Sequence, residues 1–265
     1  MGRSLDAKSI KSAQRVFEVL EYFDADHPEA SVTDISRRYG YPQSSASELL
    51  TYMTHLGYLR RGTRGRTYQL SMRVAMLGAW VQPQLVRNGR LLRLMDEIAV
   101  ETGCSTILAT NSGVRLQCLH VVRRDDDAPR QGEFIPLLHS AEGHALMLSS
   151  ERDLVRKYVH RLNSEVMEEG RRVRFDDLAT ELDGASARGY VRKVDAAGSA
   201  FAILLPNADR GEQLALCVRA PAGAHEEAIV RTMRSIVSRT LGLVSIPSAM
   251  PPGITSPRQF ARLAR

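Results

Sequence analysis

The chain has 265 residues, which suits two modest domains better than one, and its 43% hydrophobic content is that of a globular protein. The net charge of +6 and the pI of about 9.5 permit nucleic-acid binding without establishing it. Three widely spaced cysteines (Cys104, Cys118 and Cys217) exclude a disulfide framework, so we expect reduced thiols in a cytoplasmic protein. No apolar run reaches the ~18 residues of a membrane helix, so we expect no membrane partner.

A first helix is predicted near the N-terminus, because apolar side chains recur there at helical spacing. A loop that contains Pro28 ends it. We expect its apolar face to pack beneath the helices that follow, and this face consists of Ile10, Ala13, Val16, Phe17, Leu20 and Phe23.

The stretch from 31 to 53 predicts two short helices joined by a tight turn. Ser31 and Asp34 have the spacing of a helix N-cap and its partner, and Gly40 tolerates the positive φ that ends a helix. Pro42 then suits the first turn of a second helix. This arrangement is a helix-turn-helix, whose second helix enters the DNA major groove. The apolar face of that second helix consists of Ala46, Leu49, Leu50 and Met53.

Side chains that suit DNA contacts occupy the polar face of the second helix and a basic hairpin, or wing, that follows it. Hydroxyl and amide groups can reach phosphates and base edges, and arginines on a hairpin tip suit phosphates or the minor groove. The alternative is an ordinary helical hairpin with a polar outer face and a solvated basic turn. The candidate DNA-binding residues are Gln43, Ser44, Ser45, Ser47, Glu48 and Tyr52 on the helix, and Arg61, Arg64 and Arg66 on the wing.

This segment resembles the winged helix-turn-helix of the IclR family of bacterial transcriptional regulators. The resemblance rests on Asp34-Ile35, Gly40, Pro42, Ser44-Ser45 and Leu56-Gly57-Tyr58-Leu59. It implies a domain of residues 8–70 that binds double-stranded operator DNA, in a protein that works as a homodimer or a dimer of dimers.

An amphipathic segment follows the wing and ends at Gly103. Its apolar stripe must be buried somewhere, and a partner chain is one economical answer. The resemblance likewise implies linker and dimerisation helices at residues 71–102, with the domain boundary at 71–82. The stripe expected to form part of the dimer interface consists of Leu91, Leu94, Met95 and Ile98.

From Ser105 onwards the sequence predicts an α+β fold, in which helices pack against a sheet. A hairpin is expected over 106–122, with further strands at 134–138, after Tyr190, at 200–205 and at 214–220. Helices are expected at 141–148, 151–162, 176–188 and 226–244. Residues 246–265, which are rich in proline and end in basic residues, predict a poorly ordered tail.

Residues 103–245 resemble the effector-binding domain of the same family, which has a GAF-like α+β fold. The resemblance rests on Pro136, Gly143-x-Ala145, Arg188-Gly189-Tyr190, Gly198 and Pro221. It implies a pocket for a small-molecule effector, and the alternative for each pocket residue is ordinary core or surface packing. By match to the family, the pocket residues are Ile135, Ala141, Glu142, Phe201, Cys217 and Arg219.

Two of these positions depart from the family pattern and suggest the chemistry of the effector. Phe201 offers a flat apolar face, and Arg219, if it points inward, is a cation that a carboxylate can satisfy bidentately. Together they favour an aromatic or otherwise apolar carboxylate. In the alternative interpretation, Arg219 faces solvent or pairs with Glu142, and the pocket is smaller or missing.

The sequence contains no convincing enzyme motif. His139, Glu142 and His144 have the spacing HxxExH, which does not set two metal ligands and a base on one helical face. No phosphate-binding glycine loop and no G-x-S-x-G occurs. We therefore expect no catalysis, metal or cofactor, and predict an effector-controlled transcriptional repressor of a catabolic operon. The alternative is a small-molecule-binding or enzymatic domain whose winged helix serves protein contacts.

Overall fold

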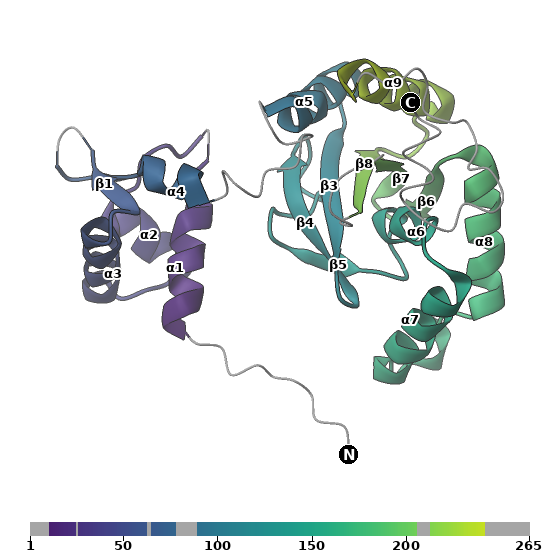
Figure 1. Cartoon of the computed structure of the whole chain (residues 1–265), viewed down its shortest axis with the longest axis horizontal. Helices are drawn as coiled ribbons and strands as arrows, with labels where there is room; N and C mark the ends of the chain where they lie inside the picture. The colour runs from purple at the N-terminus through teal and green to yellow at the C-terminus, as the bar shows by residue number, and fades with distance from the viewer. Residues whose placement is uncertain (1–10, 25, 63–64, 78–88, 206–212, 242–265) are drawn as a thin grey trace. The chain divides into compact units, whose positions relative to one another are not determined.

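The computed structural model describes residues 11–24, 26–62, 65–77, 89–205 and 213–241, and it divides into two compact units, Met1–Gln82 and Pro83–Arg265 (Figure 1). Several sequence predictions concern residues outside these ranges: Ile10, Arg64, the segment 78–88 and the tail at 246–265. Among the described residues, no helix combines the length and the apolar character needed to cross a bilayer. Cys104, Cys118 and Cys217 are buried free thiols.

The first unit is a winged helix-turn-helix. Ser31 caps its second helix as predicted: the Ser31 hydroxyl accepts from the Asp34 amide at 3.2 Å, and the Asp34 carboxylate accepts from the Ser31 amide at 2.8 Å. Gly40 ends that helix at a φ of 69°. The elements are α1 (Lys11–Tyr22), α2 (Val32–Tyr39), α3 (Gln43–His55), β1 (Leu59–Arg61), β2 (Tyr68–Leu70) and α4 (Met72–Leu77).

The core of this unit corrects the prediction for α1. Val19 is the fully buried residue of that helix, whereas Phe17 is 63% exposed and Ala13 is also exposed. Two residues correspond to about 200° around a helix, so the side that buries Val19 turns Phe17 outwards. The core residues are Val19, Ala30, Ile35, Ala46, Leu50, Met53, Leu59 and Tyr68.

The second unit is built on one antiparallel six-stranded sheet of order β5-β4-β3-β8-β7-β6. This arrangement confirms the predicted α+β class. The strands are β3 (Ser105–Ser112), β4 (Arg115–Val122), β5 (Phe134–Pro136), β6 (Val191–Asp195), β7 (Gly198–Leu205) and β8 (Leu214–Ala220). The helices are α5 (Arg90–Thr102), α6 (Ala141–Met147), α7 (Arg152–Glu165), α8 (Phe175–Arg188) and α9 (Glu226–Leu241), with a short 3-10 turn at Glu169–Arg171.

Each face of the sheet has its own hydrophobic core. Helices α6, α7 and α8 cover one face, while α5 and α9 cover the other (Figure 1). The strands alternate between these faces, so Ala215 and Cys217 of β8 face α6, and Leu216 and Val218 face α5 and α9.

The stripe on α5 is not available to a partner chain. Leu91, Leu94, Met95 and Ile98 are each no more than 2% exposed and pack against α9 and the sheet of their own unit. The expectation that this stripe forms part of a dimer interface is therefore wrong. The physical reason is that the sheet has a second apolar face, which needs a covering layer of helices as much as the first does.

Candidate DNA-binding surface and effector cavity

The candidate DNA-binding residues of α3 lie together on one surface of the first unit. Gln43, Ser44, Glu48 and Tyr52 are exposed, and the buried residues Ala46, Leu50 and Met53 hold the opposite side of the helix in the core. A shallow groove runs between α1 and α3. Its lining includes Ser44, Ser45, Ser47, Glu48 and Tyr52 of α3, together with Ser12 and Arg15 of α1.

Arg15 is a basic residue of this surface that the sequence analysis missed. Its guanidinium lies 4.7 Å from the centre of the Tyr41 ring, in the segment just before α3. Such a contact fixes a long side chain while leaving its charge in place. In the sequence, Arg15 stands within an amphipathic helix, and nothing there distinguishes it from a solvated helix residue.

The two described arginines of the predicted wing set differ in their surroundings. Arg61 donates to the Gly65 carbonyl at 3.2 Å, and its guanidinium stacks 4.5 Å from the centre of the Tyr68 ring. Arg66 is exposed and has no hydrogen bond or ion pair among the described residues. Arg66 is thus the freer of the two to reach a phosphate, while Arg61 also stabilises the wing.

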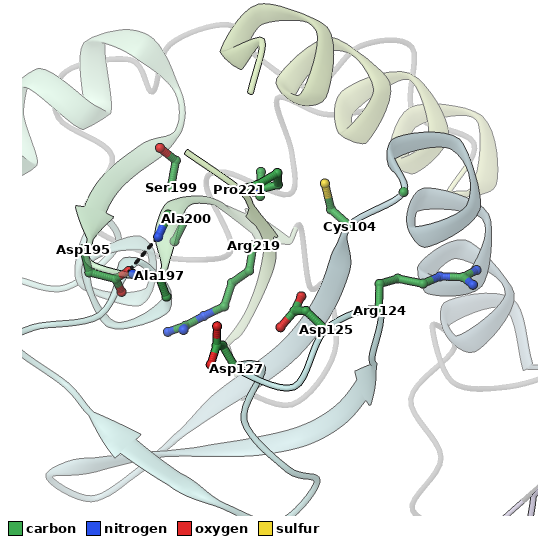
Figure 2. Close-up of a pocket in the computed structure, with 13 residues that line it drawn as sticks. Cys104, Arg124, Asp125, Asp127, Asp195, Ala197, Ser199, Ala200, Arg219 and Pro221 are labelled. Atoms are coloured by element: carbon green, nitrogen blue, oxygen red, sulfur yellow. Dashed lines mark hydrogen bonds between the residues drawn. The ribbon is translucent and has the colours of Figure 1, made fainter. Parts of the chain in front are cut away.

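A cavity of about 320 Å³ opens at one end of the sheet in the second unit (Figure 2). It lies where β3 and β7 begin and β8 ends, and the loop after β4 borders it. Gly198 permits this close packing of β7 on the end of β8, because a Cβ there would lie 2.2 Å from the Ala220 carbonyl oxygen. The lining residues are Gly103, Cys104, Arg124, Asp125, Asp127, Asp195, Ala197, Gly198, Ser199, Ala200, Arg219, Ala220 and Pro221.

Of the two arginines that line this cavity, Arg219 is the one that belongs to a strand of the sheet, β8. Its side chain extends from β8 along the cavity towards the side where Asp127 lies (Figure 2). Its Nε is buried without an acceptor, and among the described residues no carboxylate forms an ion pair with the guanidinium. Arg219 therefore lines a cavity, and among the described residues no ion pair joins it to Glu142.

Two of the three aspartates that line the cavity are engaged in holding its walls. Asp125 accepts hydrogen bonds from the Ser105 hydroxyl and from the Ala128 amide at 2.8 Å, which fixes the loop after β4. Asp195 accepts from the amides of Ala197 and Gly198 at 2.9 and 3.1 Å, which fixes the turn between β6 and β7 (Figure 2). These two carboxylates thus fix the walls of the cavity. The Nε of Arg219 remains a hydrogen-bond donor without an acceptor.

Glu142, in the first turn of α6, carries a completely buried carboxylate. Among the described residues no N–H or O–H group donates to either of its oxygens, and the weakly donating Cys217 thiol is the neighbour that acts on it as a hydrogen-bond partner. Leaving a buried acceptor without a strong donor costs about 1–3 kcal/mol. Burial and then the Glu142 carboxylate raise the pKa of the Cys217 thiol well above its usual value, and the same two causes raise the pKa of Cys118 to about 12. Arg219 opposes this rise at both thiols.

The start of α6 is held tightly against the preceding strand segment. The Ser140 hydroxyl caps the helix by accepting from the Gly143 amide at 3.1 Å. A Cβ at position 143 would lie 1.9 Å from the Leu137 carbonyl oxygen, so the close approach requires glycine. This contact sets Glu142 directly over the sheet.

Comparisons with known proteins agree with this architecture. A family model described as the IclR helix-turn-helix domain matches residues 12–62. The transcriptional repressor IclR of Escherichia coli K12 is 24% identical over 189 residues, which are 68% of each chain. The E. coli regulator XynR is 25% identical over 141 residues, which are 52% of this chain and 56% of XynR, so the chain spans about half the length of that relative.

Solved structures support the fold of both units. An IclR homolog from Microbacterium hydrocarbonoxydans, complexed with 4-hydroxybenzoate, has a TM-score of 0.56 and 22% identity, and the match covers 86% of this chain and 97% of that one. The Thermotoga maritima IclR has a TM-score of 0.55 and 14% identity, with 95% and 99% covered. The chain is similar to the IclR family, whose helix-turn-helix domain it carries at residues 12–62. The match to the helix-turn-helix model lies in the first unit, and the solved structures share the fold of both units.

The pocket residues expected of an IclR-family member do not all lie together here. Arg219 lines the cavity described above, while Ala141, Glu142 and Cys217 are buried between α6 and the sheet, on the same face as Arg219. Ile135 lines a separate apolar cavity of about 310 Å³ near the end of α7, at the opposite end of β4.

Phe201 corrects the family match. It faces α5 and α9, on the opposite side of the sheet from Cys217, so the two cannot line one cavity. The error is a shift of one residue along β7, which exchanges the two faces of a strand. Ala200 and Ala202 occupy the face on which Phe201 was expected.

The described residues contain no group of three or more His, Cys, Asp or Glu side chains arranged to hold a metal ion. Of the three residues in the HxxExH spacing, His139 is exposed, whereas Glu142 and His144 are buried. The His144 Nε2 lies 2.8 Å from the Leu138 carbonyl oxygen, so this imidazole is held by the backbone.

Proposed function

We propose that this chain is a transcriptional repressor that binds operator DNA through α3 and the wing, and that a small organic carboxylate bound at Arg219 controls it. The observation that carries the effector part is the guanidinium of Arg219, which lines a cavity without an ion-pair partner among the described residues. An effector carboxylate would supply that partner and could accept two parallel hydrogen bonds from it.

The size of the cavity supports a compact effector. A volume of about 320 Å³ is at the lower end of the ~300–1,000 Å³ usual for ligand sites, which suits a molecule with one ring. The solved homolog from M. hydrocarbonoxydans binds 4-hydroxybenzoate, so aromatic acids are the first compounds to test. Phe201 no longer supports the aromatic class, because its ring lies on the other face of the sheet.

The DNA part of the proposal rests on the exposed face of α3. A single winged helix makes few base contacts, so we infer that the repressor binds two half-sites as a symmetric dimer. Apolar side chains of α4 are a better candidate for part of the dimer contact than the buried stripe of α5. Met72, Met76 and Leu77 are exposed by 77, 63 and 52%.

The effector assignment is tested by measuring the affinity of aromatic and aliphatic monocarboxylates for the parent protein and for Arg219→Ala. Loss of a hydrogen-bonded charge pair of ~1.5–3 kcal/mol predicts a 10- to 150-fold weaker affinity in the variant. Arg115→Ala is the matched control, because Arg115 lines the second cavity and likewise has no ion pair among the described residues. Equal affinity of Arg219→Ala and the parent, or binding confined to uncharged analogues, would exclude the assignment.

The repressor assignment is tested separately by a gel shift with the protein's own upstream region and a genomic competitor. We expect a specific complex that dissociates when a binding acid is added. A reporter fused to the same region should be more active when the gene is deleted. Binding no tighter to the upstream region than to competitor DNA would contradict operator recognition, and reduced reporter activity after deletion would contradict repression.

A further inference from the structure

The wing is too short to hold its position on the first unit by itself. Strands β1 and β2 have three residues each and pair from Leu59 opposite Leu70 to Arg61 opposite Tyr68. A two-stranded hairpin is marginally stable at best in water and needs a further element to pack against. The loop between α1 and α2 supplies one, because the Ala30 amide donates to the Tyr68 carbonyl at 2.9 Å and the Tyr68 amide donates to the Ala30 carbonyl at 2.8 Å.

Glu29, which precedes this bridge, holds the side of β2 that points away from the core. Successive side chains of a strand point to opposite faces, so the buried Tyr68 leaves Thr67 and Gln69 on the outer side. The Thr67 hydroxyl donates to one carboxylate oxygen of Glu29 at 2.6 Å, and the Gln69 amide group donates to the other. The carboxylate thus joins the loop to two residues that lie 38 and 40 positions further along the chain.

Close packing around Thr67 fixes this contact. The Gly62 amide donates to the Thr67 carbonyl at 2.9 Å, and a Cβ at position 62 would lie 2.1 Å from the Thr67 hydroxyl oxygen and 3.2 Å from the Glu29 carboxylate. A side chain at position 62 would therefore push the two apart. The Gln69 amide is oriented by the same carboxylate, which accepts but cannot donate, so the amide oxygen stays buried without a donor among the described residues.

Thr67 follows directly on Arg66, the exposed wing arginine without a hydrogen bond or ion pair among the described residues. Holding Thr67 fixes the direction in which the chain leaves Arg66. A side chain that starts from a fixed backbone loses less conformational freedom when it binds a phosphate. The charge of Glu29 acts in the opposite direction, because a carboxylate repels the phosphates of DNA. The hydrogen bonds and the charge of Glu29 therefore predict effects of opposite sign on DNA affinity.

We propose that Glu29 is a positioning residue for DNA binding: it holds the wing, through Thr67 and Gln69, at the angle from which Arg66 reaches a phosphate. The inference rests on the proposed function, in which the wing contacts operator DNA. It assigns a favourable role in DNA binding to an acidic residue that lies outside both α3 and the wing. If the charge of Glu29 were its main contribution, every variant that lacks the carboxylate would bind DNA more tightly.

The deciding comparison is between Glu29→Ala and Glu29→Gln, with labelled upstream-region DNA and competitor DNA titrated at several salt concentrations. Both variants lose the charge, but the glutamine amide can accept from Gln69 and donate to the Thr67 hydroxyl. We expect Glu29→Ala to bind both DNAs roughly 3- to 10-fold more weakly than the parent, and its salt slope to fall towards that of Arg66→Ala. Glu29→Gln should bind at least as tightly as the parent.

Two further variants separate support of the wing from the effect of charge. Glu21→Ala removes the same charge from an exposed position of α1 and should not weaken binding. Thr67→Val removes one partner of Glu29 from the other side of the contact, so it should weaken binding in the parent but not in Glu29→Ala. Thermal unfolding of each variant establishes that it is folded before its affinities are compared.

The outcomes separate the inference from the proposed function. Glu29→Ala binding as tightly as Glu29→Gln, or weakening the Arg66→Ala protein as much as it weakens the parent, would overturn the role of Glu29 and leave DNA binding intact. A parent that binds neither DNA would instead end the proposed function, and the role of Glu29 with it.

Discussion

The Nδ1 of His144, a buried residue of α6, lies 3.4 Å from the carboxylate of Glu181, an exposed residue of α8. The imidazole is only 2% exposed, and its Nε2 faces the Leu138 carbonyl. Glu181 also accepts from Lys193 of β6 at 2.8 Å. Burial, followed by the charge of Lys193, lowers the pKa of His144 to about 4, and the Leu138 carbonyl and Glu181 only partly oppose this.

This arrangement predicts a loss of stability in mild acid. Below about pH 6.5 the unfolded chain takes up a proton at His144 that the folded chain refuses until about pH 4, so stability falls as the pH decreases through this window. The full effect is roughly 3 kcal/mol. Urea unfolding between pH 4 and 7 should give a shallower pH dependence for His144→Gln than for the parent. The exposed His160 provides the control, since His160→Gln should retain the parent's profile. An unchanged profile in His144→Gln would contradict the prediction.

Glu142 is expected to reduce the stability of the ligand-free protein. Glu142→Met removes two buried oxygens to which no N–H or O–H group of the described residues donates, and it keeps the volume, so we predict an increase of about 1–3 kcal/mol in the free energy of unfolding. For a domain of this size each kcal/mol corresponds to ~2–4 °C in Tm. Glu101→Met, at an exposed position of α5, should change Tm little. A decrease in Tm for Glu142→Met would mean that the carboxylate has a stabilising partner.

The wing is expected to contribute nonspecific affinity through Arg66. Removing one phosphate contact should weaken binding to all DNA sequences about equally and reduce the slope of log affinity against log salt by ~0.9. The comparison is Arg66→Ala against Arg161→Ala, an equal change of charge at an exposed position in the second unit. Titration of labelled DNA at several salt concentrations provides the slopes. The same slope in both variants would mean that Arg66 does not contact phosphate.

The exposed methionines of α4 should influence assembly. Replacing Met72 and Met76 by glutamate would introduce charges into a face that we expect to be buried between two chains, so dimers should dissociate at micromolar concentration and operator affinity should fall. Met167→Glu is the matched control, because Met167 is 98% exposed in the second unit. Light scattering measures the oligomeric state of both variants. A parent protein that is monomeric while binding its operator fully would contradict the dimer itself.

Local signals in the sequence predicted much of the fold. The capping pair of Ser31 and Asp34, the positive-φ glycine at position 40 and the apolar periodicity of α3 each specify their structure within one or two turns of chain. The strands and helices of the second unit follow from runs of apolar residues in the same way. These elements are determined by interactions between near neighbours, which a single sequence displays.

The errors concern the choice of face. Phe201 and the stripe of α5 were both recognised as apolar, but a sequence does not state which side of a sheet a strand residue faces or which surface a helix covers. With two apolar faces on one sheet, a shift of one residue yields an equally plausible pattern. Glu142 was named as a pocket residue from the family match, but its complete burial was not evident, because a glutamate in the first turn of a helix is usually a solvated residue that favours the helix dipole. Its burial arises from the packing of α6 on the sheet, with the start of the helix held close to the Leu137 carbonyl at Gly143.

The alternation along β8 has a practical consequence for engineering biosensors. Residues 215, 217 and 219 lie on the α6 and cavity side, whereas 214, 216, 218 and 220 pack beneath α5 and α9. Arg219 and Ala220 line the cavity, whereas Ala215 and Cys217 are fully buried in the core. A library meant to explore new inducers would therefore vary the cavity end of the strand. Randomising the core positions would mainly yield destabilised proteins.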